Sequence, residues 1–451
     1  MTISQQFAEF GTALRWEKLP SEVQQRARLV LLDMLGATIA GSTTPTARQG
    51  SAVARRYGAS DAAQLIGQRQ RASVPFAALA NGMNCHALEV DDGHRRAIGL
   101  HNAATATPAA LAVAEEEDAS MERFLAAMVL GYEVASRLGS AMNPAHRHAG
   151  FHSTGTLGVF GAAAAAAYLR GLDAEKCARA LGIAGSASAG IFEFLSDGST
   201  SKHFHGGHAA MSGIVAADLA AEGLTGPMRI FEGDEGILKV YSQGVDPETI
   251  TQGLGERYEV MNLFFKIHAT CAHVFSPIDA VLKLRSQIGT PVRFERMVVR
   301  TYHAAAILNQ QRPPTRAGAK FSIPYCATIA WIHGKASDEM FEPKHLEDPE
   351  LLELAARVEV VEDPEIHADF PNTRAARVEV TLPDGSHKEA YVPLPKGMPE
   401  CPASEDELAT KFHGLVRPIL GEMATERLRE TVLRGGGISA RQLAEMTVPR
   451  L

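Results

Sequence analysis

The amino-acid sequence predicts a mainly α-helical protein, with a large all-helical domain and a smaller α+β domain. Three observations indicate this fold class: helical periodicity up to about residue 255, β-rich segments after about residue 258, and helical patterns again from residue 404. A chain of 451 residues is long enough for two or three folding units of roughly 100–200 residues each. We expect the helical domain to comprise residues 1–262 and 402–451, and the α+β domain to comprise residues 263–401.

The clearest predicted helix covers residues 21–41. Val23, Ala27 and Val30 follow the spacing of one buried helical stripe, and Gly41 stands where a helix usually ends. Further helices are expected over residues 75–89, 105–117, 121–142, 154–170, 174–188 and 208–222. Small residues dominate several of these segments, for example GVFGAAAAAAYL, so we expect closely packed helices that are buried on several faces.

The smaller domain is predicted from alternating segments. Residues 377–382 alternate between apolar and polar side chains, which places Val378 and Val380 on one face of a strand. Residues 383–385 (Pro-Asp-Gly) supply a turn, after which residues 390–392 can return as the partner strand. Further strands are expected over residues 291–301 and 357–361, with a helix over residues 319–333 between them.

The last part of the sequence returns to helical patterns. Ser404 and Glu407 form a capping-box pattern that opens a helix to about residue 416. A second helix is expected before the glycines at residues 435–437. We expect these helices to pack back onto the first domain, which would make that domain discontinuous in sequence.

The charge balance argues against two classes of partner. Lys and Arg total 44 and Asp and Glu total 52, for a formal net charge of −8. Nucleic acids and membrane surfaces are polyanionic and call for a basic face. We therefore expect neither nucleic-acid nor membrane binding, although local basic clusters remain compatible with a small anionic ligand.

Cysteine usage and the N-terminal sequence indicate a cytoplasmic protein. The cysteines are scattered and contain no CxxC pair, which favours neither disulfides nor a structural zinc or iron–sulfur site. They are Cys85, Cys177, Cys271, Cys326 and Cys401. The N-terminal residues lack a basic segment followed by an apolar core, and no apolar run is long enough for a bilayer span.

Ionisable side chains gather in four stretches of otherwise apolar sequence. The stretches are HALEVDDGHRRAIGLHN (86–102), HRHAGFHSTGT (146–156), STSKHFHGGHAA (199–210) and FFKIHATCAHVFSPIDA (264–280). In the third stretch Lys202, Gly206 and Gly207 lie in a predicted loop before a helix, whose free N–H groups would favour a carboxylate. A partly desolvated lysine there would also have a lowered pKa and could act as a base. In the first stretch Asp91 is placed to orient a histidine such as His101 for acid–base work.

Each of these stretches also has a structural interpretation. Adjacent aspartates before a glycine are usual at turns, and a Lys-His segment is often a solvated surface. The HxHxxH pattern of His203, His205 and His208 is a possible metal site, although no carboxylate lies near it in sequence. Cys271 is a possible nucleophile or a small buried apolar residue. The recurrence of four such stretches favours an enzyme.

These stretches carry a resemblance to a known family. The relevant segments are LLDMLGATIAGS (31–42), HALEVDDGHRRAIGLHNAATATPAALAVAE (86–115), GFHSTGTLGVFGAAAAA (150–166), SKHFHGGHAAMSGIVAADLAAEGLTGP (201–227), RIFEGDEG (229–236) and KIHATCAHVFSPIDA (266–280). In this order they resemble the MmgE/PrpD family, which includes 2-methylcitrate dehydratase, cis-aconitate decarboxylase and iminodisuccinate epimerase. The resemblance covers nearly the whole chain.

The resemblance implies a helical domain with a smaller α+β lid domain, a homodimer, and a site at the domain interface that needs neither metal nor cofactor. By position it assigns functional roles to five residues. They are Asp91, His101, His152, Lys202 and Lys266.

The sequence departs from the family pattern at three places. His101-Asn102-Ala103 stands where members acting on citrate-like acids commonly have His-Pro-Ser, and residues 93–96 (Gly-His-Arg-Arg) replace a segment of the dehydratase and decarboxylase branches. Cys271 lies between His268 and His273, where the decarboxylase branch has a histidine shortly after the lysine. The substrate is therefore not defined by the resemblance.

The sequence predicts a lyase that removes a proton next to a carboxylate of a small di- or tricarboxylic acid. The favoured interpretation is a hydro-lyase similar to 2-methylcitrate dehydratase, in which either His101 or Lys202 is the base, the other donates a proton, and Asp91 orients His101. The expected substrate-binding residues are His152, Lys266, Arg95, His268 and Cys271. Alternatives are an epimerase of an iminodisuccinate-like acid, a cis-aconitate-type decarboxylase, and a binder of polycarboxylates without catalytic activity.

Overall fold

The computed structural model describes residues 1–242, 244–289 and 293–449, and these residues form two compact units. The helical unit contains residues 1–194, 200–264 and the C-terminal segment from Ser404. The mixed unit contains residues 265–403 together with residues 195–199, a short segment that the sequence analysis places with the helices. The predicted fold class, mainly α with a smaller α+β part, is confirmed. None of the helices described is both long enough and apolar enough to cross a membrane.

Most of the helical unit is built from helices, some of which correspond to the predicted ones. These are α1 (Ile3–Ala13), α2 (Ser21–Gly41), α3 (Pro45–Tyr57), α4 (Val74–His86), α5 (Ala106–Glu116), α6 (Met121–Met142), α7 (Ala145–His148), α8 (Ser153–Thr156), α9 (Gly158–Leu169), α10 (Ala174–Ala184), α11 (Ser201–Ala221), α12 (Ile237–Tyr241) and α13 (Glu248–Thr251). Two short antiparallel pairs accompany them, β1 (Ala63–Gln64) with β2 (Arg71–Ala72) and β3 (Gly93–His94) with β4 (Leu263–Phe264). The helices α2 and α6 have the predicted bounds.

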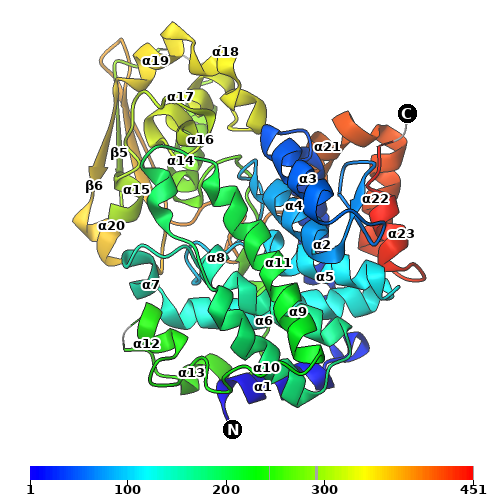
Figure 1. Cartoon of the computed structure of the whole chain (residues 1–451). Helices are drawn as coiled ribbons and strands as arrows, with labels where there is room; N and C mark the ends of the chain where they lie inside the picture. Colours follow the sequence, from blue (N-terminus) through cyan, green and yellow to red (C-terminus); the bar gives the residue numbers. More distant parts are fainter. Residues whose placement is uncertain (243, 290–292, 450–451) are drawn as a thin grey trace. The chain divides into compact units, whose positions relative to one another are not determined.

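Helix α11 lies at the centre of the packing in this unit. It packs against α4 and α9, and α9 in turn packs against α6 (Figure 1). Small residues permit these close approaches: a Cβ atom on Gly207 would lie 2.2 Å from the backbone oxygen of Leu79, and one on Gly161 would lie 2.5 Å from that of Gly131. The prediction of closely packed, small-residue helices therefore describes the core of this unit.

Two predicted helices differ most clearly from those in the structure. The segment 154–170 is broken at Leu157 into α8 and α9. The helix expected over 208–222 begins at Ser201, so the prediction of a loop around Lys202 was wrong. The glycines at 206 and 207 that suggested a loop lie inside α11, because they allow it to approach α4 closely.

The mixed unit is built on a four-stranded sheet. Its strands are β5 (Arg296–Thr301), β6 (Val358–Glu362), β7 (Ala376–Thr381) and β8 (His387–Val392), in the order β6-β5-β7-β8. Only β5 and β6 are parallel. The predicted hairpin at residues 377–392 is confirmed, with Val378 and Val380 buried. Residues 296–301 of the expected strand 291–301 form β5, whereas residues 291 and 292 lie outside the described residues.

Helices cover this sheet and connect its strands. They are α14 (Phe275–Ile288), α15 (His303–Ala306), α16 (Arg316–Ala319), α17 (Ile323–His333), α18 (Pro343–Leu346), α19 (Pro349–Ala355) and α20 (Pro364–Ala368). The helix α14 packs against β7, β8 and α17. The unit is therefore of the α+β type.

The C-terminal helices pack within the helical unit, beside α2 and α5 (Figure 1). They are α21 (Glu405–Leu420), α22 (Glu422–Arg434) and α23 (Ala440–Glu445). The predicted capping box of Ser404 and Glu407 opens α21. On the facing surface of α2, Gly36 leaves room for the ring of Phe412, and the Lys411 ammonium lies 2.5 Å from an oxygen of Asp33.

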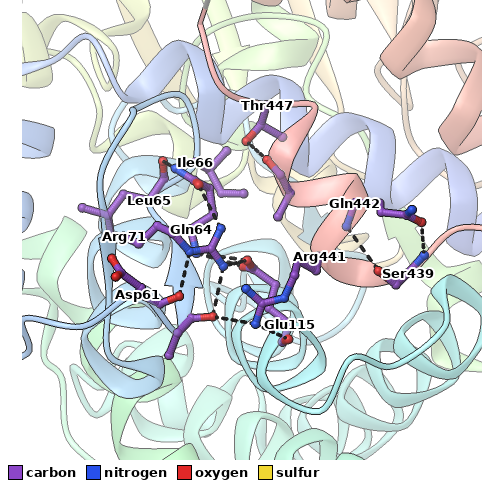
Figure 2. Close-up of polar contacts among 12 residues, drawn as sticks. Asp61, Gln64, Leu65, Ile66, Arg71, Glu115, Ser439, Arg441, Gln442 and Thr447 are labelled. Atoms are coloured by element: carbon purple, nitrogen blue, oxygen red, sulfur yellow. Dashed lines mark hydrogen bonds and ion pairs between the residues drawn. The ribbon is translucent and has the colours of Figure 1, made fainter.

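Glu115 links the last helix, the β1–β2 pair and α5. Arg441 donates to the backbone oxygen of Glu115 at 3.0 Å, and the Glu115 side chain accepts hydrogen bonds from the backbone N–H of Gln64 and from Arg71 (Figure 2). Burial raises the pKa of Glu115 to about 7, although its hydrogen bonds and Arg71 oppose that shift.

Candidate active site

Four histidines from different elements of the helical unit form one cluster. His86 ends α4, His101 precedes a short 3₁₀ turn, His152 precedes α8, and His205 lies in the first turns of α11. The ring centroids are 4.7 Å apart for His86 and His101, 5.9 Å for His86 and His152, and 5.1 Å for His152 and His205. We refer to these four residues as the histidine cluster.

The Asp91-Asp92 segment orients two of these rings. An oxygen of Asp91 lies 2.6 Å from Nδ1 of His86 and 3.3 Å from Nδ1 of His101. The backbone oxygen of Asp92 lies 2.5 Å from Nδ1 of His101. A carbonyl oxygen only accepts hydrogen bonds, so Nδ1 of His101 carries a proton, and in the neutral ring Nε2 is the basic nitrogen. The sequence pairs Asp91 with His101, whereas the nearer contact of Asp91 is with His86.

Lys202 brings a positive charge to the same region. Its ammonium group contacts the carboxylate of Glu89, and both side chains are buried. Glu89 has a left-handed backbone with φ of 57°, a conformation that is costly for residues other than glycine and that often marks functional sites. The charge of Lys202 also helps to lower the pKa values of His86 and His152.

Three members of the cluster are neutral at pH 7. Burial lowers the pKa of His86 to about 3 even though Asp91 opposes the shift, and it lowers the pKa of His205 to about 4. Burial lowers the pKa of His152 well below its ordinary value, with further contributions from the neighbouring His86 and Lys202. Each neutral ring therefore has one nitrogen that donates and one that accepts.

Two ring nitrogens of the cluster remain available for a ligand. Nε2 of His86 and Nε2 of His152 are buried and have no hydrogen-bond partner in the part of the chain that the structure describes. One ring nitrogen from each of His86, His101 and His152 lies within 4.8 Å of the other two. Buried polar atoms are costly when unpartnered. These nitrogens are therefore placed to bind polar atoms of a small ligand.

The same spacing is compatible with a transition metal, and a second group of potential ligands is formed by Asp91, Asp92 and His101. The HxHxxH alternative is not supported by the geometry. His203 bonds to the Thr46 hydroxyl at 2.9 Å and His205 lies against His152. Among the described residues, neither group of potential ligands contains His203, His205 or His208.

The structure brings together Asp91, His101, His152 and Lys202, which all belong to the helical unit. Arg95, also in this unit, is half-buried, and its backbone N–H donates to the backbone oxygen of Asn262.

The remaining predicted residues lie in the mixed unit. Lys266 is buried, and Nε2 of His268 lies 2.7 Å from an oxygen of Asp279. The other oxygen of Asp279 accepts from the backbone N–H of Lys396. The backbone N–H of Cys271 donates to the oxygen of Lys320.

No role was predicted from the sequence for His86 or Glu89, and His205 was considered only as part of a possible metal site. His205 could have been found from helical spacing, because Lys202 and His205 are three positions apart and share one face once α11 begins at Ser201. His86 and Glu89 have no comparable local signal. Their roles depend on the contact of His86 with Asp91 and of Glu89 with Lys202, which form only in the folded chain.

The chain is thus a mainly helical protein of two units whose larger unit buries a cluster of acid–base side chains. Comparison with known families gives a more specific result: residues 5–250 match the MmgE/PrpD N-terminal domain and residues 268–434 match the MmgE/PrpD C-terminal domain. The chain therefore belongs to the MmgE/PrpD family, as its motifs suggest.

Curated relatives are similar over almost the full length. A cis-aconitate decarboxylase-like protein of Aspergillus oryzae is 28% identical over 459 residues, which covers 96% of this chain and 94% of that protein. The human cis-aconitate decarboxylase is 27% identical over 443 residues, covering 96% and 91%. The enzyme of Aspergillus terreus is 24% identical over 457 residues, covering 96% and 92%. These relatives support a lyase-like function at the level of the family.

Proposed function

We propose that this protein is a lyase that acts on a small di- or tricarboxylic acid by moving a proton at a carbon next to a carboxylate. The observation that carries the proposal is the buried grouping of His101, whose Nε2 can take a proton, with Lys202 and two neutral histidines whose Nε2 atoms are available. A C–H bond next to a carboxylate is weakly acidic, so its ionisation needs both a base and a fixed positive charge.

The proposed base is His101. With its Nδ1 proton directed at the Asp92 carbonyl, the ring accepts a proton at Nε2, and Asp91 at 3.3 Å stabilises the imidazolium that results. Lys202 is proposed to bind a substrate carboxylate and to stabilise the charge that develops on it. His152 is proposed to hold the substrate through Nε2.

Four further residues are proposed to bind substrate on the basis of the family resemblance and the sequence. They are Lys266, Arg95, His268 and Cys271. Replacement of Lys266 by Ala is the sharpest test, and a raised KM for the acid would support its role. The homodimer implied by the resemblance is also a proposal, which sedimentation equilibrium of the purified protein tests.

Two reactions share this chemistry. Decarboxylation is favoured by the names of the curated relatives: the bond from carbon to one carboxyl group breaks, CO₂ leaves, and the electron pair is stabilised by a neighbouring carboxylate before a proton is added. Dehydration is favoured by His86, whose neutral ring directs Nδ1 at Asp91 and leaves Nε2 as an acceptor for a substrate hydroxyl. In that reaction Nε2 of His101 takes the C–H proton, the C–O bond breaks, and the hydroxyl leaves as water with a proton donated by the ammonium of Lys202.

An NMR assay in D₂O distinguishes these reactions. The panel contains citrate, 2-methylcitrate, cis-aconitate and iminodisuccinate. Loss of CO₂ with one deuterium in the product identifies a decarboxylase, formation of a double bond with release of water identifies a hydro-lyase, and deuterium in an otherwise unchanged acid identifies an epimerase. Binding of these acids without turnover or exchange would contradict the proposal and leave the binding protein as the alternative.

A further inference from the structure

The contact between His152 and His205 joins two nitrogens of the same kind. Their Nδ1 atoms lie 2.9 Å apart, with the ring planes at 51°. A hydrogen bond between two imidazole nitrogens requires that one carries the proton and the other offers an electron pair. Because burial lowers the pKa values of both rings, the pair shares a single proton between the two Nδ1 atoms at neutral pH.

The position of that proton determines whether Nε2 of His152 is a hydrogen-bond donor or an acceptor. If Nδ1 of His205 donates, Nδ1 of His152 accepts and Nε2 of His152 carries a hydrogen. If Nδ1 of His152 donates, its Nε2 has an electron pair instead. A neutral imidazole has only these two tautomers, so the two ends of the ring are coupled.

The surroundings of His152 hold its ring in one orientation. Phe192 and Phe194 pack edgewise against it, with centroids 4.8 Å and 5.4 Å away, and His86 stacks on it with the planes at 14°. The residue is also anchored by its backbone N–H, which donates to Gly190. Nε2 is buried and lacks a partner among the described residues. A polar ligand atom is therefore the expected partner of Nε2.

We propose that His205 is a positioning residue that donates its Nδ1 proton to Nδ1 of His152 and thereby fixes Nε2 of His152 as a hydrogen-bond donor to a substrate carboxylate. The contact between the two Nδ1 atoms indicates that the rings share one proton, whereas the choice of His205 as its donor and of a carboxylate as the ligand rests on the proposed function. A carboxylate oxygen only accepts, so the opposite tautomer would present an electron pair to it. Lys202 and His205 share one face of α11, so this helix supplies both a positive charge and the residue that fixes the tautomer of His152.

NMR of the full-length protein labelled with ¹⁵N-histidine tests the tautomer without any substrate. In the unaltered protein at pH 7 we expect Nε2 of His152 and Nδ1 of His205 to be protonated, with signals assigned by their loss in His152→Gln and His205→Asn. In His205→Asp the new side chain only accepts, so Nδ1 of His152 should become protonated. Protonated Nδ1 on His152 in the unaltered protein, or no change in a folded His205→Asp variant, would overturn the proposal.

Ligand-binding measurements on the same protein test whether this tautomer contributes to the binding of a carboxylate. An asparagine amide can donate from about the position of the imidazole Nδ1, so His205→Asn should keep the affinity for citrate and for cis-aconitate, measured by calorimetry. His205→Leu removes the donor and should weaken binding about ten-fold. His208→Asn, on the same helix, is the control and should bind normally.

If His205→Asn and His205→Leu weakened ligand binding equally, His205 would have only a packing role, and the proposal would be overturned. If the tautomers are as expected but the unaltered protein binds no acid of the panel, the assignment of a carboxylate ligand fails together with the proposed function. The two failures are therefore distinguishable, because the NMR measurement needs no ligand.

Discussion

At the scale of single residues, Asp91 contacts two histidines of the candidate site. One of its oxygens contacts Nδ1 of His86 at 2.6 Å and Nδ1 of His101 at 3.3 Å. Nδ1 of His101 is also held by the Asp92 carbonyl. Asp91 therefore supplies charge to both rings, while the backbone fixes the tautomer of the proposed base.

This arrangement predicts different effects for two substitutions. His101→Gln removes the base and should lower kcat by about 10²–10⁴-fold. Asp91→Asn leaves the Asp92 carbonyl in place and should lower kcat less, because it weakens the stabilisation of the imidazolium without changing the tautomer of His101. Rates with the panel acid that turns over, measured beside the His208→Gln control, check both. Unchanged rates in a folded His101→Gln variant would exclude His101 as the base.

Lys202 and Glu89 have a structural role that can be separated from catalysis. Lys202→Met removes the ammonium from a buried carboxylate and should destabilise the protein by about 3 kcal/mol. Adding Glu89→Gln removes that charge, so the double variant should recover much of the stability but none of the activity. Urea unfolding and kcat/KM measure the two effects. Recovery of activity in the double variant would contradict the role of Lys202 in the reaction.

At the scale of elements, α11 positions the site because it packs closely against α4. Gly206 and Gly207 lie where Cβ atoms would approach Ala104 and the backbone of Leu79. The same glycines caused the sequence to predict a loop. Lys202 and His205 occupy the turn before these glycines, so the fit between α11 and α4 determines where both side chains lie.

A pair of glycine substitutions tests this packing. In Gly207→Ala the new Cβ would lie 2.2 Å from the Leu79 oxygen and force the helices apart, at a cost of roughly 1–3 kcal/mol. Gly414→Ala is the matched control, because it lies within α21 with nothing within 4 Å of an added Cβ. The control should gain about 0.5–1 kcal/mol. Equal stabilities of the two variants would contradict the packing argument.

At the scale of the whole molecule, side chains far apart in sequence connect the chain within each unit. In the helical unit, Arg441 near the C-terminus reaches the backbone of Glu115, and Lys411 reaches Asp33 (Figure 2 shows the first of these). In the mixed unit, Asp279 links His268 to the backbone of Lys396. These contacts are buried or half-buried, so they contribute more than surface ion pairs do.

Glu115 makes stability depend on pH. Its pKa rises from 4.5 in the unfolded chain to about 7 in the fold. The folded protein therefore keeps a proton that the unfolded chain releases, and stability falls as pH increases from about 4.5 to about 7, by on the order of 3 kcal/mol. Glu115→Gln cannot ionise and should lose less stability between pH 5 and pH 8. Urea unfolding at both pH values checks this, and identical pH dependence in the two proteins would contradict it.

Much of the fold was predictable because its signals are local. The apolar spacing of residues 21–41, the alternation in residues 377–382 and the capping box at Ser404 each act within a few residues, and α2, β7 and α21 form accordingly. The start of α11 was not predictable in this way. Glycine favours loops in isolation, and only the neighbouring α4 makes glycine necessary inside this helix.

The sequence alone determined which chemical groups this protein has and which local elements carry them: Asp91, His101, His152 and Lys202 are all recognisable from their motifs. Only the tertiary structure decided their partners, such as His86 for Asp91 and His205 for His152. The physical reason is that a hydrogen bond depends on positions within a few tenths of an ångström. The packing of helices that are distant in sequence sets those positions. It therefore also determines which nitrogen of each ring carries the proton.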